Sequence, residues 1–168
     1  AEGLCENTPY GPLASGVIYN ETWEAGTKGW TFVSTNPDVK WQLDTTEQNQ
    51  GGKSLYCGKV PEYSYDFGAT MASATRTVTL PPSDDIKLSL WVKQDLDESG
   101  SCNYDVTRVF VNDVEVIELC SNLLVFTEST YDITAYAGQT ITIEIEFATV
   151  DGVANNGKGV WVDDVTIT

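Results

Sequence analysis

The sequence contains no histidine, the first of several absences that narrow its function. Without an imidazole there is no Ser–His or Cys–His nucleophilic pair and no histidine general base. The G-x-S-x-G, P-loop and G-x-G-x-x-G motifs are also missing. Carboxylate pairs spaced for glycoside hydrolysis arise by chance among 25 acidic residues, and no pair stands out. We therefore expect a protein that is not an enzyme.

Basic residues are scarce, with nine Lys and Arg against 25 Asp and Glu, for a net charge of −16. A field of this sign repels phosphate backbones and anionic lipid surfaces, so neither nucleic acid nor a membrane is an expected partner. No apolar run approaches the roughly 20 residues of a membrane helix. The acidic surface favours cations, neutral ligands or basic partners, or it serves solubility alone.

The four cysteines form no C-x-x-C pair, and without histidine a zinc site is not expected. An even number of cysteines in a chain of secreted character predicts two disulfides and an oxidising, extracellular location. Of the three possible pairings we favour Cys102–Cys120, because both residues lie near the ends of one local strand pair. Cys5–Cys57 then pins the N-terminal segment to the body. The N-terminus carries no basic-plus-apolar signal, so we expect any signal peptide to have been removed.

Short strand-like runs follow an irregular N-terminal strap, residues 1–16. In Ile86–Gln94 and Thr140–Phe147, apolar and polar residues alternate, which indicates antiparallel strands with one buried face. Further runs span 17–24, 29–34, 39–44, 54–57, 70–80, 104–112, 114–119, 123–127 and 159–167. No longer stretch has helical periodicity. The pattern predicts an all-β, two-sheet antiparallel β-sandwich, a jelly roll, as a single domain over residues 17–168. We expect a monomer.

Three segments carry a family resemblance, namely ETWEAGTKGW (21–30), TYDITAYAGQTITIEIEF (130–147) and VWVDDVTI (160–167). With GGKSLYC (51–57), their order resembles the galactose-binding-like jelly rolls of bacterial secreted proteins, of the MAM-like, cleaved-adhesin and choice-of-anchor type. They are also similar to jelly-roll carbohydrate-binding modules. The resemblance covers roughly residues 20–168 and implies the fold more specifically than the ligand.

The resemblance also implies a structural calcium ion between the first and last strands. Glu24 and Asp163 would supply side-chain oxygens, and Thr22 and Lys53 would supply backbone carbonyls. Calcium takes six to eight oxygen ligands of these kinds. Two carboxylates brought together beside the core also repel each other unless a cation separates them. The alternative is that both are ordinary charges at strand edges.

A second acidic segment, Asp95–Gly100, matches positions 1, 3, 5 and 6 of a D-x-D-x-[DNS]-G calcium loop. Its position 12 is Val106 instead of Glu, and no helices flank it. We favour the plainer interpretation, an acidic hairpin loop next to Cys102.

Sugars stack on exposed aromatic rings beside a few polar groups, so aromatic residues outside the core are the candidates for a binding surface. Trp91, Arg108 and Phe110 all alternate with apolar neighbours, which predicts one sheet-face site. Gln94, Glu144 and Glu146 would complete its polar rim. The loops at 63–65 and 150–158 are an alternative location, since loop tips often carry function.

These observations favour a non-catalytic carbohydrate-binding or adhesion module of a secreted bacterial protein, with a polysaccharide or glycan as partner and calcium as its cofactor. The alternative is a structural or protein-interaction module attached to a secreted protease or adhesin. In that case the aromatic surface would contact a neighbouring domain.

Overall fold

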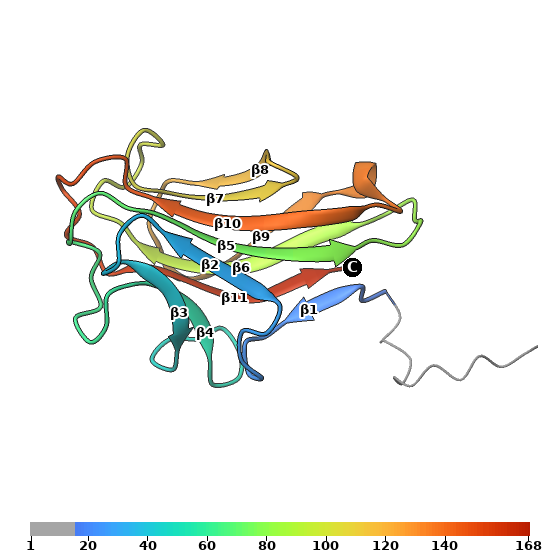
Figure 1. Ribbon diagram of the computed structural model, residues 1–168, viewed down its shortest axis with the longest axis horizontal. Coiled ribbons are helices and arrows are strands. Elements are labelled where there is room, and N and C mark those ends of the chain that lie inside the picture. Colours follow the sequence, from blue (N-terminus) through green and yellow to red (C-terminus); the bar gives the residue numbers. More distant parts are fainter. Residues whose placement is uncertain (1–15) are drawn as a thin grey trace, which may run out of the picture.

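The structure of the protein, a computed structural model, describes residues 16–168 (Figure 1). Its strands are β1 (Tyr19–Glu21), β2 (Trp30–Ser34), β3 (Lys40–Asp44), β4 (Ser54–Gly58), β5 (Met71–Thr79), β6 (Lys87–Asp95), β7 (Val106–Val111), β8 (Val114–Leu119), β9 (Leu123–Asp132), β10 (Thr140–Ala148) and β11 (Gly159–Ile167). A single 3-10 turn, η1 (Thr134–Tyr136), precedes β10. Every predicted strand-like run overlaps one of these strands. The predicted strap, 1–16, lies almost wholly outside the described residues.

The strands form two antiparallel sheets that pack face to face. One sheet has the order β3-β4-β11-β6-β9, with β1 also paired to β11, and the other has the order β2-β5-β10-β7-β8. We call them the six-stranded and the five-stranded sheet. Because most neighbouring strands in each sheet are not consecutive in the chain, the fold is a jelly-roll sandwich and not a series of hairpins. The predicted all-β sandwich is confirmed.

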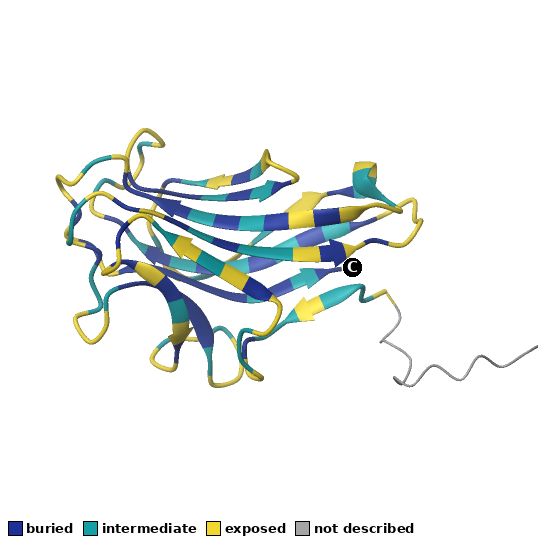
Figure 2. Cartoon of the chain, in the orientation of Figure 1, coloured by how far each residue is buried: buried dark blue, intermediate teal, exposed yellow. Residues whose placement is uncertain are grey.

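The core lies between the sheets, where the alternating apolar residues meet. Ile141, Ile143, Ile145 and Phe147 of β10 are fully buried (Figure 2). The six-stranded sheet contributes Leu88, Leu90 and Val92 of β6, together with the inward residues of β4 and β11. Burial of alternate residues along both central strands is what the period of two predicts.

The edges of β11 explain how the N-terminal part of the fold is arranged. Residues 160–162 pair with β4, and residues 165–167 pair with β1, so two strands share one side of β11. Between these halves, the pairing of β11 with β6 shifts register at Asp163, and Asp164 has a positive φ of 48°. At this β-bulge, Asp163 contacts the loop that precedes β4.

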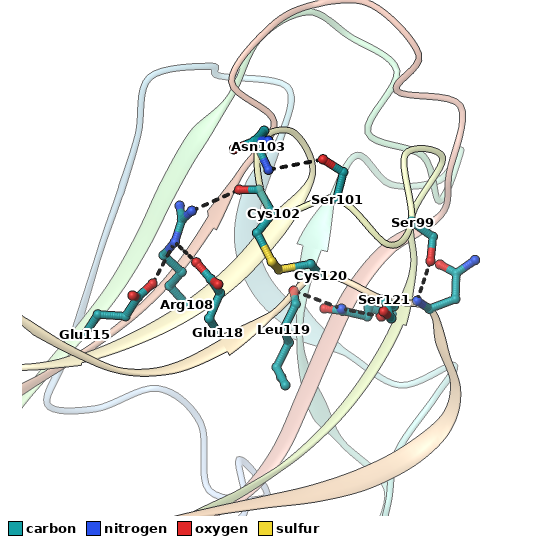
Figure 3. Close-up of a disulfide and its surroundings, with 12 residues drawn as sticks. Ser99, Ser101, Cys102, Asn103, Arg108, Glu115, Glu118, Leu119, Cys120 and Ser121 are labelled. Atoms are coloured by element: carbon teal, nitrogen blue, oxygen red, sulfur yellow. Dashed lines mark hydrogen bonds and ion pairs between the residues drawn. A yellow bond between two sulfur atoms is a disulfide. The ribbon is translucent and has the colours of Figure 1, made fainter.

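Cys102 and Cys120 form a disulfide, the pairing expected from the sequence, and it joins the loop before β7 to the end of β8 (Figure 3). Cys57 is buried on the inner face of β4 and has no disulfide partner among residues 16–168. Its predicted partner, Cys5, lies outside the described residues, so Cys5–Cys57 stays a prediction.

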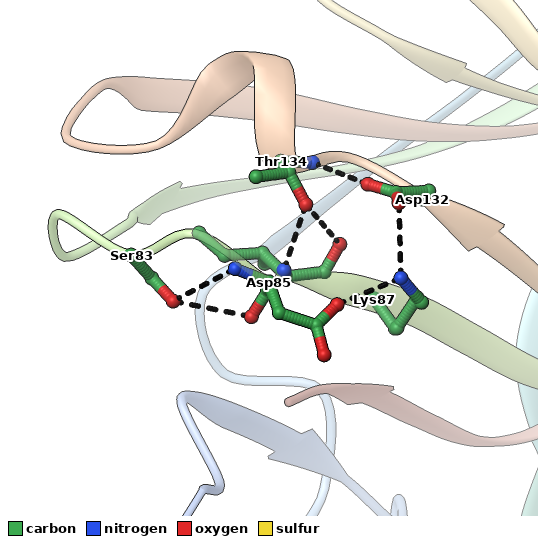
Figure 4. Close-up of polar contacts among 6 residues, drawn as sticks. Ser83, Asp85, Lys87, Asp132 and Thr134 are labelled. Atoms are coloured by element: carbon green, nitrogen blue, oxygen red, sulfur yellow. Dashed lines mark hydrogen bonds and ion pairs between the residues drawn. The ribbon is translucent and has the colours of Figure 1, made fainter.

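Polar contacts tie the opposite end of the sandwich together (Figure 4). The Lys87 ammonium donates to Asp85 at 2.7 Å and to Asp132 at 2.9 Å. Asp132 in turn accepts the backbone N–H of Thr134, and the Thr134 hydroxyl accepts the backbone N–H of Ile86. These contacts join the start of β6 to the end of β9 and to η1.

Candidate functional site

The predicted binding patch is divided between the two sheets. Trp91 lies in β6 of the six-stranded sheet, whereas Arg108 and Phe110 lie in β7 of the five-stranded sheet. All three alternate with buried neighbours such as Val92 and Val109, so all three point away from the core. The outer faces of two stacked sheets point in opposite directions. The prediction of one surface formed by Trp91, Arg108 and Phe110 was therefore wrong.

Strand pairing arranges the outer face of the five-stranded sheet in rows. One row consists of Val33, Ser73, Glu146, Arg108 and Glu118. The next row consists of Thr31, Thr75, Glu144, Phe110 and Glu115. None of these residues is buried, so we call this surface the open face. It presents hydroxyls, carboxylates, one guanidinium and one aromatic ring on adjoining strands.

Arg108 is the fixed point of the open face, because acidic side chains hold its guanidinium (Figure 3). Its Nε lies 2.8 Å from the Glu115 carboxylate and 3.1 Å from that of Glu118, and its Nη2 donates to the Cys102 carbonyl at 3.2 Å. Glu146 lies 4.0 Å from Nη1 on the other side. An arginine held by several partners loses little conformational freedom when it binds a ligand.

A shallow cavity of about 350 Å³ lies at one end of the open face. It is lined by Thr35, Ala69, Thr70, Met71, Arg108, Ala148 and Val150. Met71 is 51% exposed and Val150 is 63% exposed, so the cavity has apolar walls beside a charged group. This combination suits a ligand that is itself part apolar and part hydroxyl.

The outer face of the six-stranded sheet is different, because a loop residue, Tyr63, covers Tyr56 and Trp161 there. Trp161 is only 2% exposed, and the Tyr63 ring stacks over it with centroids 6.5 Å apart. The buried carboxylate of Asp44 accepts hydrogen bonds from Trp161 Nε1 at 2.9 Å and from the Tyr63 hydroxyl at 2.7 Å. We call Asp44, Tyr56, Tyr63 and Trp161 the aromatic cluster. Its rings pack on one another and leave little surface for a ligand.

Two other predicted locations are placed by the structure. Gln94 points into the core and is fully buried, since its amide donates to the carbonyls of Leu119 and Ser121. The prediction that it belongs to a polar rim was wrong, whereas Glu144 and Glu146 do lie on the open face. In the 63–65 loop, Tyr63 covers Trp161 and Tyr65 is buried.

The predicted calcium ligands Glu24 and Asp163 meet the same loop, 49–53. Asp163 Oδ2 accepts the backbone N–H groups of Asn49 and Gln50, at 2.9 and 3.3 Å. Glu24 Oε1 accepts those of Gly52 and Lys53, at 3.0 and 2.9 Å. The fold thus brings carboxylates from positions far apart in sequence to the two ends of one short loop. Thr22 precedes Glu24 by two residues.

The donor set agrees with a hard cation. Asp163 is fully buried, and burial raises its pKa to about 6 even though three backbone N–H groups favour its charged form. A buried carboxylate with a raised pKa is stabilised in its charged form by a cation. Lys53, a residue of this loop, donates its ammonium to the Glu24 carbonyl.

Sequence reasoning missed Met71, Glu115 and Glu118 on the open face. β7 and β8 form a hairpin whose register shifts between Val109 and Phe110. Only this bulge places Glu118 opposite Arg108 and Glu115 opposite Phe110. No sequence signal marked the bulge.

In residues 16–168, no helix has the length and hydrophobicity of a membrane span. No protein family model and no curated protein matches the chain. Among solved structures, the chain is similar to TmCBM61 bound to β-1,4-galactotriose, with TM-score 0.61, 15% identity, and 88% of this chain and 93% of that chain covered. It is similar to a cleaved adhesin domain of Lys-gingipain from Porphyromonas gingivalis, with TM-score 0.60, 13% identity, and 89% and 96% covered.

A third similar structure is the CBM22-1 xylan-binding domain from Paenibacillus barcinonensis Xyn10C, with TM-score 0.51, 16% identity, and 90% and 92% covered. At these identities the likeness concerns the fold. The chain therefore has the β-sandwich of carbohydrate-binding modules and of a cleaved adhesin domain, as the resemblance of its sequence motifs implied.

Proposed function

We propose that this chain is a non-catalytic, extracellular glycan-binding module that binds a neutral polysaccharide on the open face. The observation that carries the proposal is the arrangement around Arg108, an oriented guanidinium between Glu146 and Glu118 with the Phe110 ring in the next row. The shared sandwich fold supports it, because TmCBM61 was solved with β-1,4-galactotriose and the CBM22-1 domain is named as xylan-binding.

The chemistry of the open face favours an uncharged sugar chain. A sugar ring stacks its apolar face on an aromatic or aliphatic side chain, for which Phe110 and Met71 are available. Its hydroxyl groups pair with carboxylates and hydroxyls, which Glu144, Glu146 and Thr75 present. The net charge of −16 disfavours sulfated and uronic-acid polymers. The Cys102–Cys120 disulfide supports an oxidising compartment.

Binding is tested by affinity electrophoresis and calorimetry against a panel of β-1,4-galactan, xylan and other neutral polysaccharides. We expect binding to at least one polymer. Phe110→Ala and Glu146→Gln should each weaken it by about tenfold, since a lost stacking contact or charged hydrogen bond is worth about 1–2 kcal/mol. Trp91→Ala is the matched control, because it removes an aromatic ring from the opposite sheet and should leave the affinity unchanged.

Two outcomes would reject this assignment. If Trp91→Ala abolishes binding while Phe110→Ala does not, the six-stranded sheet carries the site. If no polysaccharide binds in the presence of calcium, the alternative of a structural or interaction module replaces glycan binding. Product analysis after long incubation with each polymer tests the non-catalytic part, since any chain shortening contradicts it.

The proposal includes a structural calcium ion held by Glu24 and Asp163, with the backbone carbonyls of Thr22 and Lys53. What supports it is that both carboxylates bind loop 49–53 while Asp163 is buried. A ligand that binds only the folded state stabilises it, by about 2.7 kcal/mol at a concentration one hundred times its Kd. Calcium should therefore raise the Tm of chelated protein, and Asp163→Asn should remove that part of the shift.

A further inference from the structure

A separate group of polar residues lies where two loops pack around the ring of Tyr65. The loop before β7 contributes the segment 97–105, and the loop before β11 contributes the segment 151–157. The Tyr65 hydroxyl donates to Asp105 Oδ2 at 2.6 Å and accepts the backbone N–H of Asp97 at 2.7 Å. The backbone N–H of Tyr65 donates to the Gly157 carbonyl. The backbone N–H of Asn156 donates to Asp97 Oδ2, and this bond joins the two loops.

Three buried oxygen atoms of these loops accept no hydrogen bond within the described part of the chain. They are Oδ1 of Asp105, Oε2 of Glu98 and Oδ1 of Asn155. The Asp105 side chain is fully buried, and Asn155 is 1% exposed. A buried oxygen without a donor costs as much as a lost hydrogen bond, and more when it is charged. The three atoms belong to loops that the Asn156–Asp97 contact joins, and one shared ligand would satisfy all of them.

No basic side chain provides that partner in residues 16–168, because the ion pairs of Lys and Arg all involve other acids. Instead, the neighbouring side chains are acidic, so they add negative charge around these oxygens. Burial, followed by repulsion from neighbouring carboxylates that include Asp97 and Asp151, raises the pKa of both Glu98 and Asp105. A proton shared by Glu98 and Asp105 would satisfy their two oxygens at most and would leave the Asn155 oxygen without a donor.

We propose that Glu98, Asp105 and Asn155 bind a divalent cation, and that calcium is the ion that fits. Carboxylate and amide oxygens are hard ligands, and the cluster offers no nitrogen or sulfur for zinc. Calcium accepts irregular loop geometry and six to eight ligands, whereas magnesium demands a near-ideal octahedron. Water completes the coordination, and Asp97 and Asp151 add negative charge nearby that favours a cation. The ion cross-links the two loops beside Tyr65.

This site differs from the calcium loop that the sequence pattern 95–100 suggested. In the structure the Ser99 hydroxyl instead accepts the backbone N–H of Asn122, and Asp95 ends β6 opposite Gly159. The ligands come from Glu98, from Asp105 near the start of β7 and from a loop fifty residues later in the chain. It is also separate from the Glu24 and Asp163 site and does not depend on glycan binding.

The test measures calcium stoichiometry by equilibrium dialysis and calorimetry, with calcium chloride added to chelator-treated full-length chain. The starting variant is Asp163→Asn, which removes the other proposed site. We expect it to retain one calcium equivalent. Adding Glu98→Gln to that background should abolish the remaining equivalent. Adding Glu62→Gln, an exposed acid after β4, should leave it unchanged.

Terbium luminescence gives a second measurement that does not rely on stability. Terbium replaces calcium, and the adjacent Tyr65 ring should sensitise its emission in the Asp163→Asn background. Addition of Glu98→Gln should remove that emission, and Asn155→Leu should reduce it several-fold. The proposal is overturned if Asp163→Asn binds no calcium, or if Glu98→Gln and Glu62→Gln have the same stoichiometry. Loss of glycan binding alone in any variant bears on the open face and not on this site.

Discussion

Replacement of Asp44 by asparagine gives the sharpest test of how the six-stranded sheet holds its covering loops. Asp44 is 5% exposed, and its Oδ2 accepts four donors: Trp161 Nε1, the Thr46 hydroxyl, and the backbone N–H groups of Thr46 and Glu47. Its Oδ1 accepts the Tyr63 hydroxyl. Burial alone would raise the Asp44 pKa, but the bonds from Thr46, Tyr63 and Trp161 outweigh it and lower the pKa.

The expected loss follows from these contacts. Asparagine keeps the shape of the side chain but not its charge. In its best orientation the amide oxygen takes the place of Oδ2 and accepts its donors, while the amide NH2 takes the place of Oδ1 and must donate to the Tyr63 hydroxyl. Bonds to a charged acceptor contribute about 1.5–3 kcal/mol each, against about 1 kcal/mol for neutral ones. Because the donors share one oxygen and removal of the charge also removes its desolvation cost, we expect Asp44→Asn to lose about 2–3 kcal/mol.

Urea denaturation followed by tryptophan fluorescence measures this loss at neutral pH. The matched control is Asp84→Asn, at an exposed residue before β6, which should change the free energy of unfolding by less than about 0.5 kcal/mol. Since the folded pKa of Asp44 is lowered, its contribution is present above the unfolded pKa and disappears as the pH falls through the folded pKa. A loss below about 1 kcal/mol, or one that persists in strong acid, would refute this account of the aromatic cluster.

Three further changes test other parts of the fold. Ile143→Ala should destabilise the protein by about 2–5 kcal/mol in urea denaturation, because Ile143 is fully buried between the sheets; an effect below about 1 kcal/mol would contradict its central place. Cys120→Ser should cost about 3 kcal/mol, since the disulfide spans a sequence separation of 18, and reduction of the wild-type protein should have the same effect. Gly159→Ala should lower the Tm clearly, because Gly159 has φ +113° and an added Cβ would lie 2.3 Å from the Cys57 carbonyl; an unchanged Tm would mean that β11 and β4 are further apart.

Alternation was enough to locate most strands, because their inner residues are apolar and their outer residues are polar. It failed at the end of β9, which extends to Asp132 and not only to residue 127. Along this edge strand both faces are polar or exposed, as Thr127, Ser129 and Thr130 show, so no period of two is visible. A strand that buries little of either face leaves no hydrophobic signal in the sequence.

The sequence predicts which single side chains point outward, but it does not predict which of them share one surface. Alternation shows whether Trp91 or Arg108 points outward, yet it does not show which sheet holds the strand. β6 and β7 are consecutive in the chain and lie in different sheets. The calcium ligands stay a prediction from motif order, and the structure shows only that Glu24 and Asp163 both accept backbone N–H groups of loop 49–53. Contacts between loops, such as the one between Asp97 and Asn156, depend on three-dimensional packing that no local pattern records.

The contrast between the two outer faces decides where a ligand has access. On the six-stranded sheet the loops 45–53 and 59–64 cover the aromatic rings, and Asp44 and Asp163 use their carboxylates to hold those loops. Those rings pack against one another and against the loops, so they stabilise the fold. On the five-stranded sheet the acids point at Arg108 instead, and no loop within residues 16–168 bonds to their remaining oxygens. The open face has fewer aromatic residues than the aromatic cluster. Its ring and its carboxylates remain accessible, so it offers a ligand more groups to bind.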